Sequence, residues 1–290
     1  MKARAFDYVR AASVAEAVAA FRAHPGDASY LAGGQSLIPS LNLRLQAPDL
    51  LIDIGRIDAL RGLELAGEEL RIGALTRHNE ILSSPLVARH VPLLALAAPW
   101  VAHPAIRNKG TLGGSLALAD PASEFPAVAL ALGARIEISA GERTRLVAAD
   151  EFFRDLYETA VEPGEIVIAA RFPVAEPDMR FAFDELARRR GDFALIGLAA
   201  AARFEGARIT QIRLVFLSAG PTPMRARDAE AAVAGSQLDD GAIAAAASAL
   251  DGDLAEIPGE VQMSAETRLH LARVLLKRQL AALRAGGVRP

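Results

Sequence analysis

Two glycine-rich segments carry the residue types best suited to binding a ligand. The first reads Ala-Gly-Gly-Gln-Ser at positions 32–36, and the second reads Thr-Leu-Gly-Gly-Ser at positions 111–115. Glycine has no Cβ, so its backbone can adopt φ > 0 and approach a ligand closely. Successive N–H groups can then converge on an anion, while serine and threonine hydroxyls add further donors. The two segments therefore indicate a site for an anionic group such as a pyrophosphate, although a single Gly-Gly pair most often marks a tight turn.

Several other kinds of site are excluded. The sequence has no G-x-G-x-x-G motif that opens a helix and no G-x-x-x-x-G-K-[ST] motif, so neither the Rossmann mode nor the P-loop mode of nucleotide binding is supported. It contains no cysteine, which excludes disulfides, thiolate metal sites, iron–sulfur ligation and a cysteine nucleophile. The five histidines are scattered, and none forms the i, i+4 pair of a helical metal site. If a nucleotide binds here, it therefore binds through a different fold.

The composition predicts a globular protein that binds neither nucleic acid nor a membrane surface. Of the 290 residues 52% are apolar, and the formal net charge is −3. This near balance of charge indicates no polybasic surface. The first residues lack the apolar core of a signal peptide, and no run approaches the ~20 apolar residues of a membrane span. We expect a cytoplasmic protein with no membrane-spanning segment.

The elements that position the two glycine segments alternate between strand and helix. Ser13 and Glu16 fit a capping box before a helix whose apolar residues run from Val14 to Phe21. Further helices are expected over 77–98, with an interruption near 83–85, and over 124–132, where Gly133 ends the helix. The second glycine segment lies in a Gly- and Pro-rich passage over 99–121. Strands are expected at residues 6–9, 29–31, 50–54, 70–74, 134–139 and 165–172.

The pattern changes after Pro177. Residues 193–204 and 209–218 are expected to form a hairpin around the Glu205-Gly206 turn. The rest is expected to be helical, so the fold class is α+β. We place a domain boundary near residues 173–180, giving domains of about 1–175, itself divided at about 58, and 178–288. The C-terminal helices are expected at residues 226–234, 239–250 and 265–284.

Longer stretches of the sequence resemble the FAD-binding medium subunits of molybdenum hydroxylases, the family of carbon monoxide dehydrogenase and xanthine dehydrogenase. AGGQSLIPSLNLR at 32–44 is similar to the family's first FAD-binding segment, and IRNKGTLGGSLALADPASEFP at 106–126 is similar to the second. LLIDIGRI and RIGALTRHNEI, which begin at positions 50 and 71, resemble the strands between them. ELARRRGDFA at 185–194 resembles the entry to the family's C-terminal domain. The matches keep the family's order across about the first 200 residues.

The resemblance implies a fold and a set of FAD contacts. The fold would be a two-part FAD-binding domain of the vanillyl-alcohol-oxidase (PCMH) type, followed by a smaller C-terminal α+β domain built from a hairpin sheet and helices. In this sequence Gln35 and Leu118 occupy positions that often hold histidine in relatives, and Glu185 lies where several relatives have lysine. The residues expected to bind FAD are Ala32, Gly33, Gly34, Gln35, Ser36 and Leu37 around the pyrophosphate, Thr111, Gly113, Gly114 and Ser115 opposite them, Asp120 and Glu124 near the ribityl chain or ribose, and the backbone of Ile168.

The same resemblance implies a division of labour between chains. FAD would be bound here, while a large partner would carry molybdopterin and a small partner two [2Fe-2S] clusters. The absence of cysteine agrees with clusters on another chain. This chain would have no catalytic residue of its own and no metal; it would accept electrons from the clusters and pass them to an external acceptor. We expect a dimer of such heterotrimers.

Two other functions remain open at this point. One is a self-contained FAD-dependent oxidase or dehydrogenase of the vanillyl-alcohol-oxidase type, which would need a substrate pocket and a base within the chain. The other is a ligand-binding or assembly protein that has lost its flavin. The lack of a recognisable acid/base cluster argues against the first, and the two intact glycine segments argue against the second.

Overall fold

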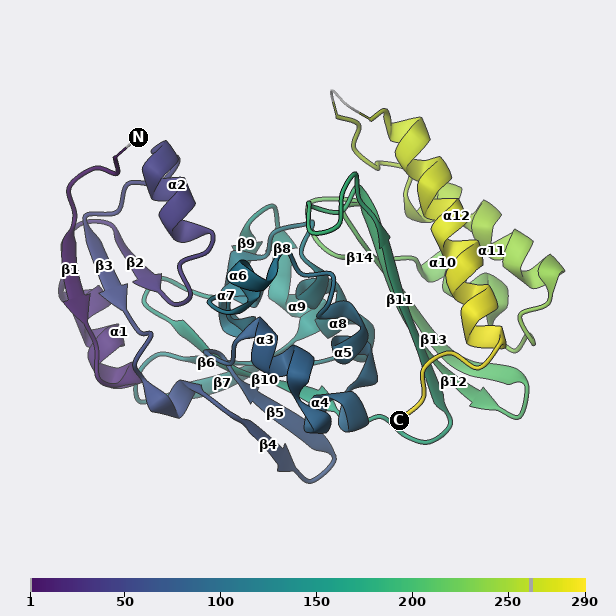
Figure 1. The fold of residues 1–290 in the computed structure, drawn as a ribbon, viewed down its shortest axis with the longest axis horizontal. Helices are drawn as coiled ribbons and strands as arrows, with labels where there is room; N and C mark the ends of the chain where they lie inside the picture. Colours follow the sequence, from purple (N-terminus) through teal and green to yellow (C-terminus); the bar gives the residue numbers. More distant parts are fainter. Residues whose placement is uncertain (1, 261–262) are drawn as a thin grey trace.

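The computed structural model describes residues 2–260 and 263–290. The chain forms three consecutive units arranged in a row, with the N-terminal unit at one end and the C-terminal unit at the other (Figure 1). Each unit contains its own β-sheet. Helices cover the sheets, which agrees with the α+β class expected from the sequence.

The N-terminal unit is a small parallel sheet with two helices. Its strands β1 (Asp7–Arg10), β2 (Ala28–Leu31) and β3 (Leu50–Asp53) pair in the order β1-β3-β2. The helices are α1 (Val14–Ala23) and α2 (Leu37–Leu43). Ser13 caps α1 and accepts a hydrogen bond from the N–H of Glu16, as the capping box predicts. The Glu16 carboxylate, however, accepts from the N–H of Ala12 instead of that of Ser13.

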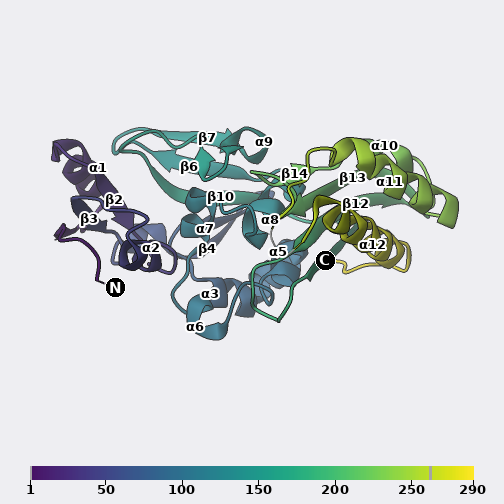
Figure 2. The same ribbon diagram turned by 90° about the horizontal axis from the view of Figure 1, so that it is seen from above.

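The middle unit is an antiparallel sheet with most of its helices on one side. Its strand order is β4-β5-β10-β6-β7, and short helix η1 (Asp58–Leu60) leads into it. Seen from above, α3 and α6 lie farthest from β6 and β7 (Figure 2). The strands are β4 (Leu63–Ala66), β5 (Glu69–Gly73), β6 (Arg135–Ser139), β7 (Thr144–Ala148) and β10 (Ile166–Pro173), with the small hairpin β8 (Phe153–Asp155) and β9 (Glu158–Thr159) beside them.

The helices of the middle unit are short because prolines interrupt them. The stretch 77–98, expected to be helical with one break, forms three helices, and Pro85 and Pro92 occupy the first positions of the second and third. Proline is tolerated there because its missing N–H would have no helical partner. The helices of this unit are α3 (His78–Ser83), α4 (Pro85–His90), α5 (Pro92–Ala97), α6 (Pro104–Arg107), α7 (Leu112–Leu118), α8 (Glu124–Leu132) and α9 (Ala149–Phe152).

The C-terminal unit is an antiparallel sheet covered on both faces. Helices α5 and α8 of the middle unit pack on one face, and α10, α11 and α12 lie on the other (Figure 1). Alternate residues of a strand point to opposite faces. Accordingly, Ala199 and Ala201 belong to the core shared with α5 and α8, whereas Leu198 and Ala200 belong to the core under the C-terminal helices. The elements are β11 (Met179–Leu186), β12 (Ile196–Glu205), β13 (Arg208–Leu217), β14 (Met224–Arg225), α10 (Arg227–Val233), α11 (Asp240–Asp253) and α12 (Ala265–Arg284).

The structure departs from the expected elements at several places, of which three concern the C-terminal sheet and the candidate site. Strand β11 was not expected, so the hairpin is part of a four-stranded sheet. The expected strand at residue 193 begins only at Ile196. Helix α7 occupies part of the passage 99–121. No helix was expected there, because the two glycines of α7 have low intrinsic helix propensity. The Thr111 cap and the burial of Leu112 and Leu116 stabilise this helix nevertheless.

Candidate functional site

One cavity of about 310 Å³ is lined by residues of both glycine segments, although Thr111 is the one residue of the second segment that lines it and Gly113, Gly114 and Ser115 do not. Residues Ala32, Gly33 and Gly34 follow β2, and Thr111 comes from the start of α7. The structure therefore brings together two segments that are far apart in the sequence. The remaining lining residues are Leu31, Ile38, Asp53, Gly55, Arg61, Leu75, Arg77 and Lys109.

The first segment presents unused backbone donors. Gly34 has φ +70°, a left-handed conformation that glycine adopts without steric cost. Within residues 2–260 and 263–290, no acceptor takes a hydrogen bond from the N–H groups of Gly33, Gly34, Gln35 or Ser36. The Gln35 side chain is turned back, and its amide donates to the Gly33 carbonyl at 3.0 Å. A run of unpaired N–H groups beside a cavity is suited to an anion.

The second segment differs from the first because its backbone is already hydrogen-bonded. Thr111 is the N-cap of α7, and its hydroxyl accepts from the N–H of Gly114 at 3.2 Å. The N–H of Gly113 donates to the Ala74 carbonyl, and the N–H of Ser115 donates to the Thr111 carbonyl. These N–H groups are therefore not available to a ligand. The segment can still contribute the hydroxyl protons of Thr111 and Ser115.

Two of the site glycines are also required by packing. A Cβ on Gly33 would lie 2.2 Å from the Lys109 carbonyl oxygen, and a Cβ on Gly113 would lie 2.4 Å from the Ala74 Cβ. Real Cβ atoms do not approach other atoms so closely. Gly33 therefore holds the first segment against residues 109–110, and Gly113 holds α7 against the end of β5.

Three basic side chains around the cavity were not expected from the sequence. Arg61, Arg77 and Lys109 all line it. Arg61 donates to the Gly55 carbonyl at 2.6 Å, and residue Arg77 pairs with Thr111 through an isolated β-bridge. Asp53 also lines the cavity, but its carboxylate is bound to Arg10 and Tyr8. The site therefore favours an anion. A sequence signal existed, because Lys109 and Arg77 lie within the stretches that resemble the FAD-binding family.

The remaining expected residues of the first segment and Ile168 do not line this cavity. Ser36 is exposed and precedes α2, and Leu37 is the first residue of that helix. Ile168 sits at a β-bulge in β10, and its carbonyl accepts from the N–H of Ala74 at 2.9 Å. Its side chain packs on the core of the N-terminal unit. The Ile168 carbonyl thus already has a protein partner.

The two expected acidic residues lie beyond the other end of α7. A helix of seven residues is about 10 Å long, so this end is well separated from the cavity at Thr111. Asp120 accepts a hydrogen bond from the N–H of Ala122 at 2.9 Å, which makes a turn between α7 and α8. Glu124 is the first residue of α8 and is only 9% exposed. Burial raises the pKa of Glu124 to about 7, and the negative charge of Asp120 acts in the same direction.

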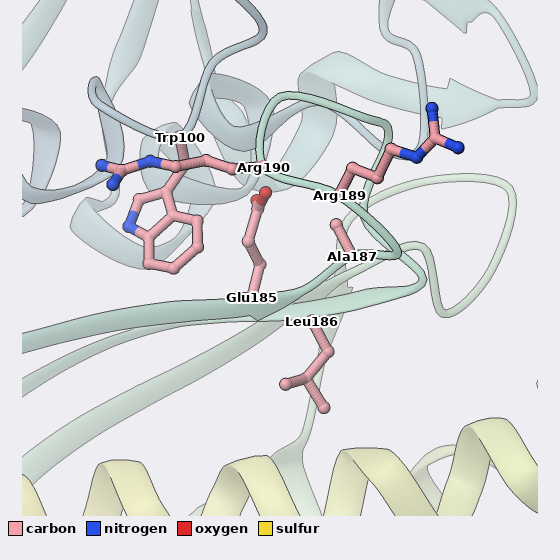
Figure 3. A pocket seen from close by; sticks show the side chains of 6 residues that line it. All are labelled: Trp100, Glu185, Leu186, Ala187, Arg189 and Arg190. Atoms are coloured by element: carbon pink, nitrogen blue, oxygen red, sulfur yellow. The ribbon is translucent and has the colours of Figure 1, made fainter.

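A second cavity, of about 260 Å³, lies between the middle and C-terminal units. Glu185 of β11 points into it, with the Trp100 indole to one side, whereas Leu186 points to the opposite side of the strand (Figure 3). Arg190 extends along Trp100, with its guanidinium 6.0 Å from the ring centroid. Burial raises the pKa of Glu185 to about 8, and the charges of Glu124 and Asp184 contribute in the same direction. This carboxyl was not among the expected site residues.

Comparison with known protein families gives the class of this protein. Residues 4–175 match the family model of the FAD binding domain in molybdopterin dehydrogenase. Residues 181–283 match that of the CO dehydrogenase flavoprotein C-terminal domain. The chain therefore belongs to the family of FAD-binding medium subunits of molybdenum hydroxylases, which confirms the resemblance seen in the sequence.

Individual relatives are similar over almost their whole length. The chain is 38% identical over 282 residues to the 6-hydroxypseudooxynicotine dehydrogenase complex subunit alpha of Paenarthrobacter nicotinovorans, covering 97% of this chain and 95% of that protein. It is 36% identical to the carbon monoxide dehydrogenase medium chain of Hydrogenophaga pseudoflava, covering 96% of each. It thus covers at least 95% of the length of each of these two relatives.

Solved structures confirm the fold. A carbon monoxide dehydrogenase from Hydrogenophaga pseudoflava contains a chain that matches with a TM-score of 0.95 and 37% identity, over 99% of this chain and 100% of that one. Quinoline 2-oxidoreductase from Pseudomonas putida 86 contains a chain that matches with a TM-score of 0.93 and 35% identity, over 99% of both chains. The α+β architecture of an FAD-binding domain followed by a C-terminal domain is therefore shown.

The residues around the first cavity fit the cofactor of this family. FAD carries a doubly charged pyrophosphate, and the cavity offers unpaired N–H groups at Gly33 and Gly34 together with the basic side chains of Arg77 and Lys109. This is an oxidoreductase component, and FAD is its cofactor.

Proposed function

We propose that this chain transfers electrons within a three-subunit molybdenum hydroxylase. FAD bound here accepts electrons from [2Fe-2S] clusters of a small partner and passes them to an external acceptor, while a large partner carrying molybdopterin oxidises the substrate. The observation that carries the proposal is the match of the whole chain to medium subunits, in a sequence without a single cysteine. Clusters need thiolate ligands, which this chain cannot supply.

We propose that FAD contacts two opposed surfaces. Residues 32–37 surround its pyrophosphate with backbone donors, and the side chains of Thr111 and Ser115 face them from α7. Gly114 leaves room for close approach there, Gly113 holds α7 in position against the end of β5, and Arg77 and Lys109 offset the charge. Asp120 and Glu124 lie towards the ribityl chain, and the strand carrying Ile168 supports that wall. When bound, the isoalloxazine ring carries the redox chemistry, and the protein supplies binding and orientation.

The partners and the location are part of the same proposal. The curated relatives include a dehydrogenase complex subunit, a medium chain and a medium subunit, which are names for one component of a larger assembly. We propose a large and a small partner, assembled with this chain as a dimer of heterotrimers in the cytoplasm. No helix within residues 2–260 and 263–290 is long and apolar enough to cross a membrane.

The experiment that tests the proposal compares the isolated chain with the assembled complex. The chain is purified, its flavin is released with acid and identified as FAD, and both samples are mixed anaerobically with the substrate of the complex while flavin absorbance is followed. Dithionite should bleach the flavin in both, whereas substrate should bleach it only in the complex.

Two results would contradict the proposal. A chain that remains colourless after reconstitution with FAD would exclude a flavoprotein. Rapid bleaching of the isolated chain by the substrate would indicate instead a self-contained flavoenzyme of the vanillyl-alcohol-oxidase type.

A further inference from the structure

The cavity between the middle and C-terminal units contains a buried carboxyl. Glu185 of β11 points into this cavity of about 260 Å³, and only 3% of the residue is exposed (Figure 3). Its Oε2 atom has no hydrogen-bond partner in the described parts of the chain. A buried polar atom without a partner is costly, and native structures rarely leave one unpaired. The carboxyl therefore indicates a ligand that supplies the missing donor.

The wall beside this carboxyl favours a flat ring. The Trp100 indole lies to one side of Glu185 and is half-buried (Figure 3). An aromatic ligand can stack on an indole ring or meet it edge to face. A cavity of roughly 150 Å³ is enough to hold benzene, so the volume here leaves room for a ring with a substituent.

Positive charge lies on the exposed rim of the cavity. The loop after β11 carries Arg188, Arg189 and Arg190, and all three are exposed. The guanidinium groups of Arg189 and Arg190 lie on opposite sides of the Glu185 carboxyl (Figure 3), and that of Arg190 is 6.0 Å from the centroid of the Trp100 ring. Solvent screens exposed charges, whereas a buried carboxyl acts on a ligand with much less screening. The interior therefore favours an N–H donor although the rim is basic.

Negative charge and neutral surfaces surround Glu185 inside the protein. Helix α5 has no charged residue, and β12 places Gly197 opposite Glu185. Burial raises the pKa of Glu185 to about 8, and the negative charges of Glu124 and Asp184 contribute in the same direction. Arg278 of α12 acts on Asp184. A positive ligand beside Glu185 would favour the ionised carboxylate, because it offsets this negative charge.

We propose that this cavity binds a flat aromatic ligand that carries an amidine or a similar pair of N–H donors, with the donors on the Glu185 carboxylate and the ring against Trp100. An amidinium group presents two parallel N–H groups that match the two oxygens of a carboxylate, as the guanidinium of arginine does. The carboxyl releases its proton to solvent as the cation binds. The inference concerns residues of this chain alone and does not depend on the proposed electron transfer.

Titration of the FAD-loaded chain with benzamidine tests the inference. Trp100 is the only tryptophan of the chain, so tryptophan fluorescence reports on this cavity. The fluorescence change should saturate, with a dissociation constant of about 1 mM or lower for a compound of this size. Benzoate has the same ring but a negative charge, and it should bind at least about tenfold more weakly, because it cannot donate to a carboxylate.

The proton released on binding gives a second measurement. One pH unit below the pKa of about 8 Glu185 is largely protonated, so calorimetry in buffers of different ionisation enthalpy should show about one proton released per benzamidine bound. Benzamidine keeps its charge in this range, whereas Glu185 gains its own as the pH rises. The affinity should therefore increase towards a pH of about 8 and become constant above it.

E185Q should bind benzamidine at least about tenfold more weakly than wild type and release no proton, because the charged acceptor is lost. The amide resembles the protonated carboxyl in shape, so the fold should be kept. W100L should also bind more weakly by calorimetry, which keeps the test available if E185Q folds poorly. Asp184→Asn is the matched control: it removes a neighbouring carboxyl that alternates to the other face of β11, and its affinity should stay within about twofold of wild type.

Three results would overturn the inference. They are the absence of a saturable fluorescence change with benzamidine in the wild-type chain, equal affinity of wild type and E185Q, and benzoate binding as tight as that of benzamidine. Each would leave the proposed function standing, because FAD binding is followed separately by flavin absorbance.

Discussion

At the scale of single residues, the four site glycines divide according to what they contact. Gly33 and Gly113 lie against backbone of other segments, whereas Gly34 has only side chains of Ile38 and Leu31 near its Cβ position. Gly114 has only the Thr111 hydroxyl within reach, at 2.9 Å. A methyl group can therefore be accommodated more easily at Gly114 than at Gly113. The glycines that the fold needs are not the same as those that leave space for a ligand.

We predict that Gly113→Ala lowers the free energy of unfolding by about 1–3 kcal/mol, the usual cost of overpacking a closed contact. The Ala74 Cβ and backbone cannot move away without shifting the end of β5. Gly114→Ala is the control, in which better helix propensity offsets the contact with Thr111. Urea denaturation of the chain measures both. Equal stability of the two variants would contradict the packing role assigned to Gly113.

The sequence predicted which residues lie together at the site better than it predicted the hydrogen bonds that they form there. Gly33, Gly34 and Thr111 were expected to meet, and they line one cavity. The hydrogen bond from the N–H of Gly113 to the Ala74 carbonyl could not be predicted, because Ala74 lies 39 positions earlier in the sequence (113 − 74 = 39), just after the end of β5. The burial of Glu124 and of Glu185 depends on the packing of the middle and C-terminal units, for which a single sequence contains no local signal.

At the scale of elements, α7 is the one that connects the two ends of the candidate site. It starts at the first cavity and ends beside Asp120, and its only side-chain cap is the Thr111 hydroxyl. We predict that Thr111→Ala lowers the free energy of unfolding by about 1 kcal/mol, the typical cost of losing an N-cap. FAD binding should weaken too, because the hydroxyl faces the cavity. Thr111→Ser is the control and should preserve both the stability and the affinity for FAD. Denaturation measures the first and flavin titration the second. A Thr111→Ala protein with wild-type affinity for FAD would exclude the proposed contact.

Elements with strong local signals were predicted to the residue. Helix α8 runs over Glu124–Leu132 with Gly133 at φ 63° as its C-cap, and α12 runs over Ala265–Arg284, both as expected. Helix α7 was missed because Gly113 and Gly114 oppose helix formation locally, and tertiary contacts overcome that preference. Strand β11 (Met179–Leu186) was missed, because the boundary was placed near residues 173–180 and no strand was expected between it and residue 193.

At the scale of the whole molecule, the largest core is shared between the two regions that match separate family models. Phe181, Phe183 and Val215 of the C-terminal sheet pack in one cluster with Leu93 and Phe125 of the FAD-binding region. We predict that a chain ending at residue 177 fails to fold, because it would expose the apolar faces of α5 and α8. Soluble yield and near-ultraviolet circular dichroism would measure this. A soluble fragment with native-like spectra would show that the FAD-binding region is stable alone.

The sandwiched C-terminal sheet restricts how new members of this family can be engineered. Replacing residues 178–290 with the corresponding region of a relative would keep the core beneath α10–α12 intact, since that cluster lies wholly within the exchanged part. It would also place foreign side chains against α5 and α8, and against Glu124. A functional chimaera must therefore be designed by the two faces of the sheet instead of by a sequence boundary. The residues of β11, β12 and β13 that face α5 and α8 should be kept from the recipient, and only those that face α10–α12 should be taken from the donor.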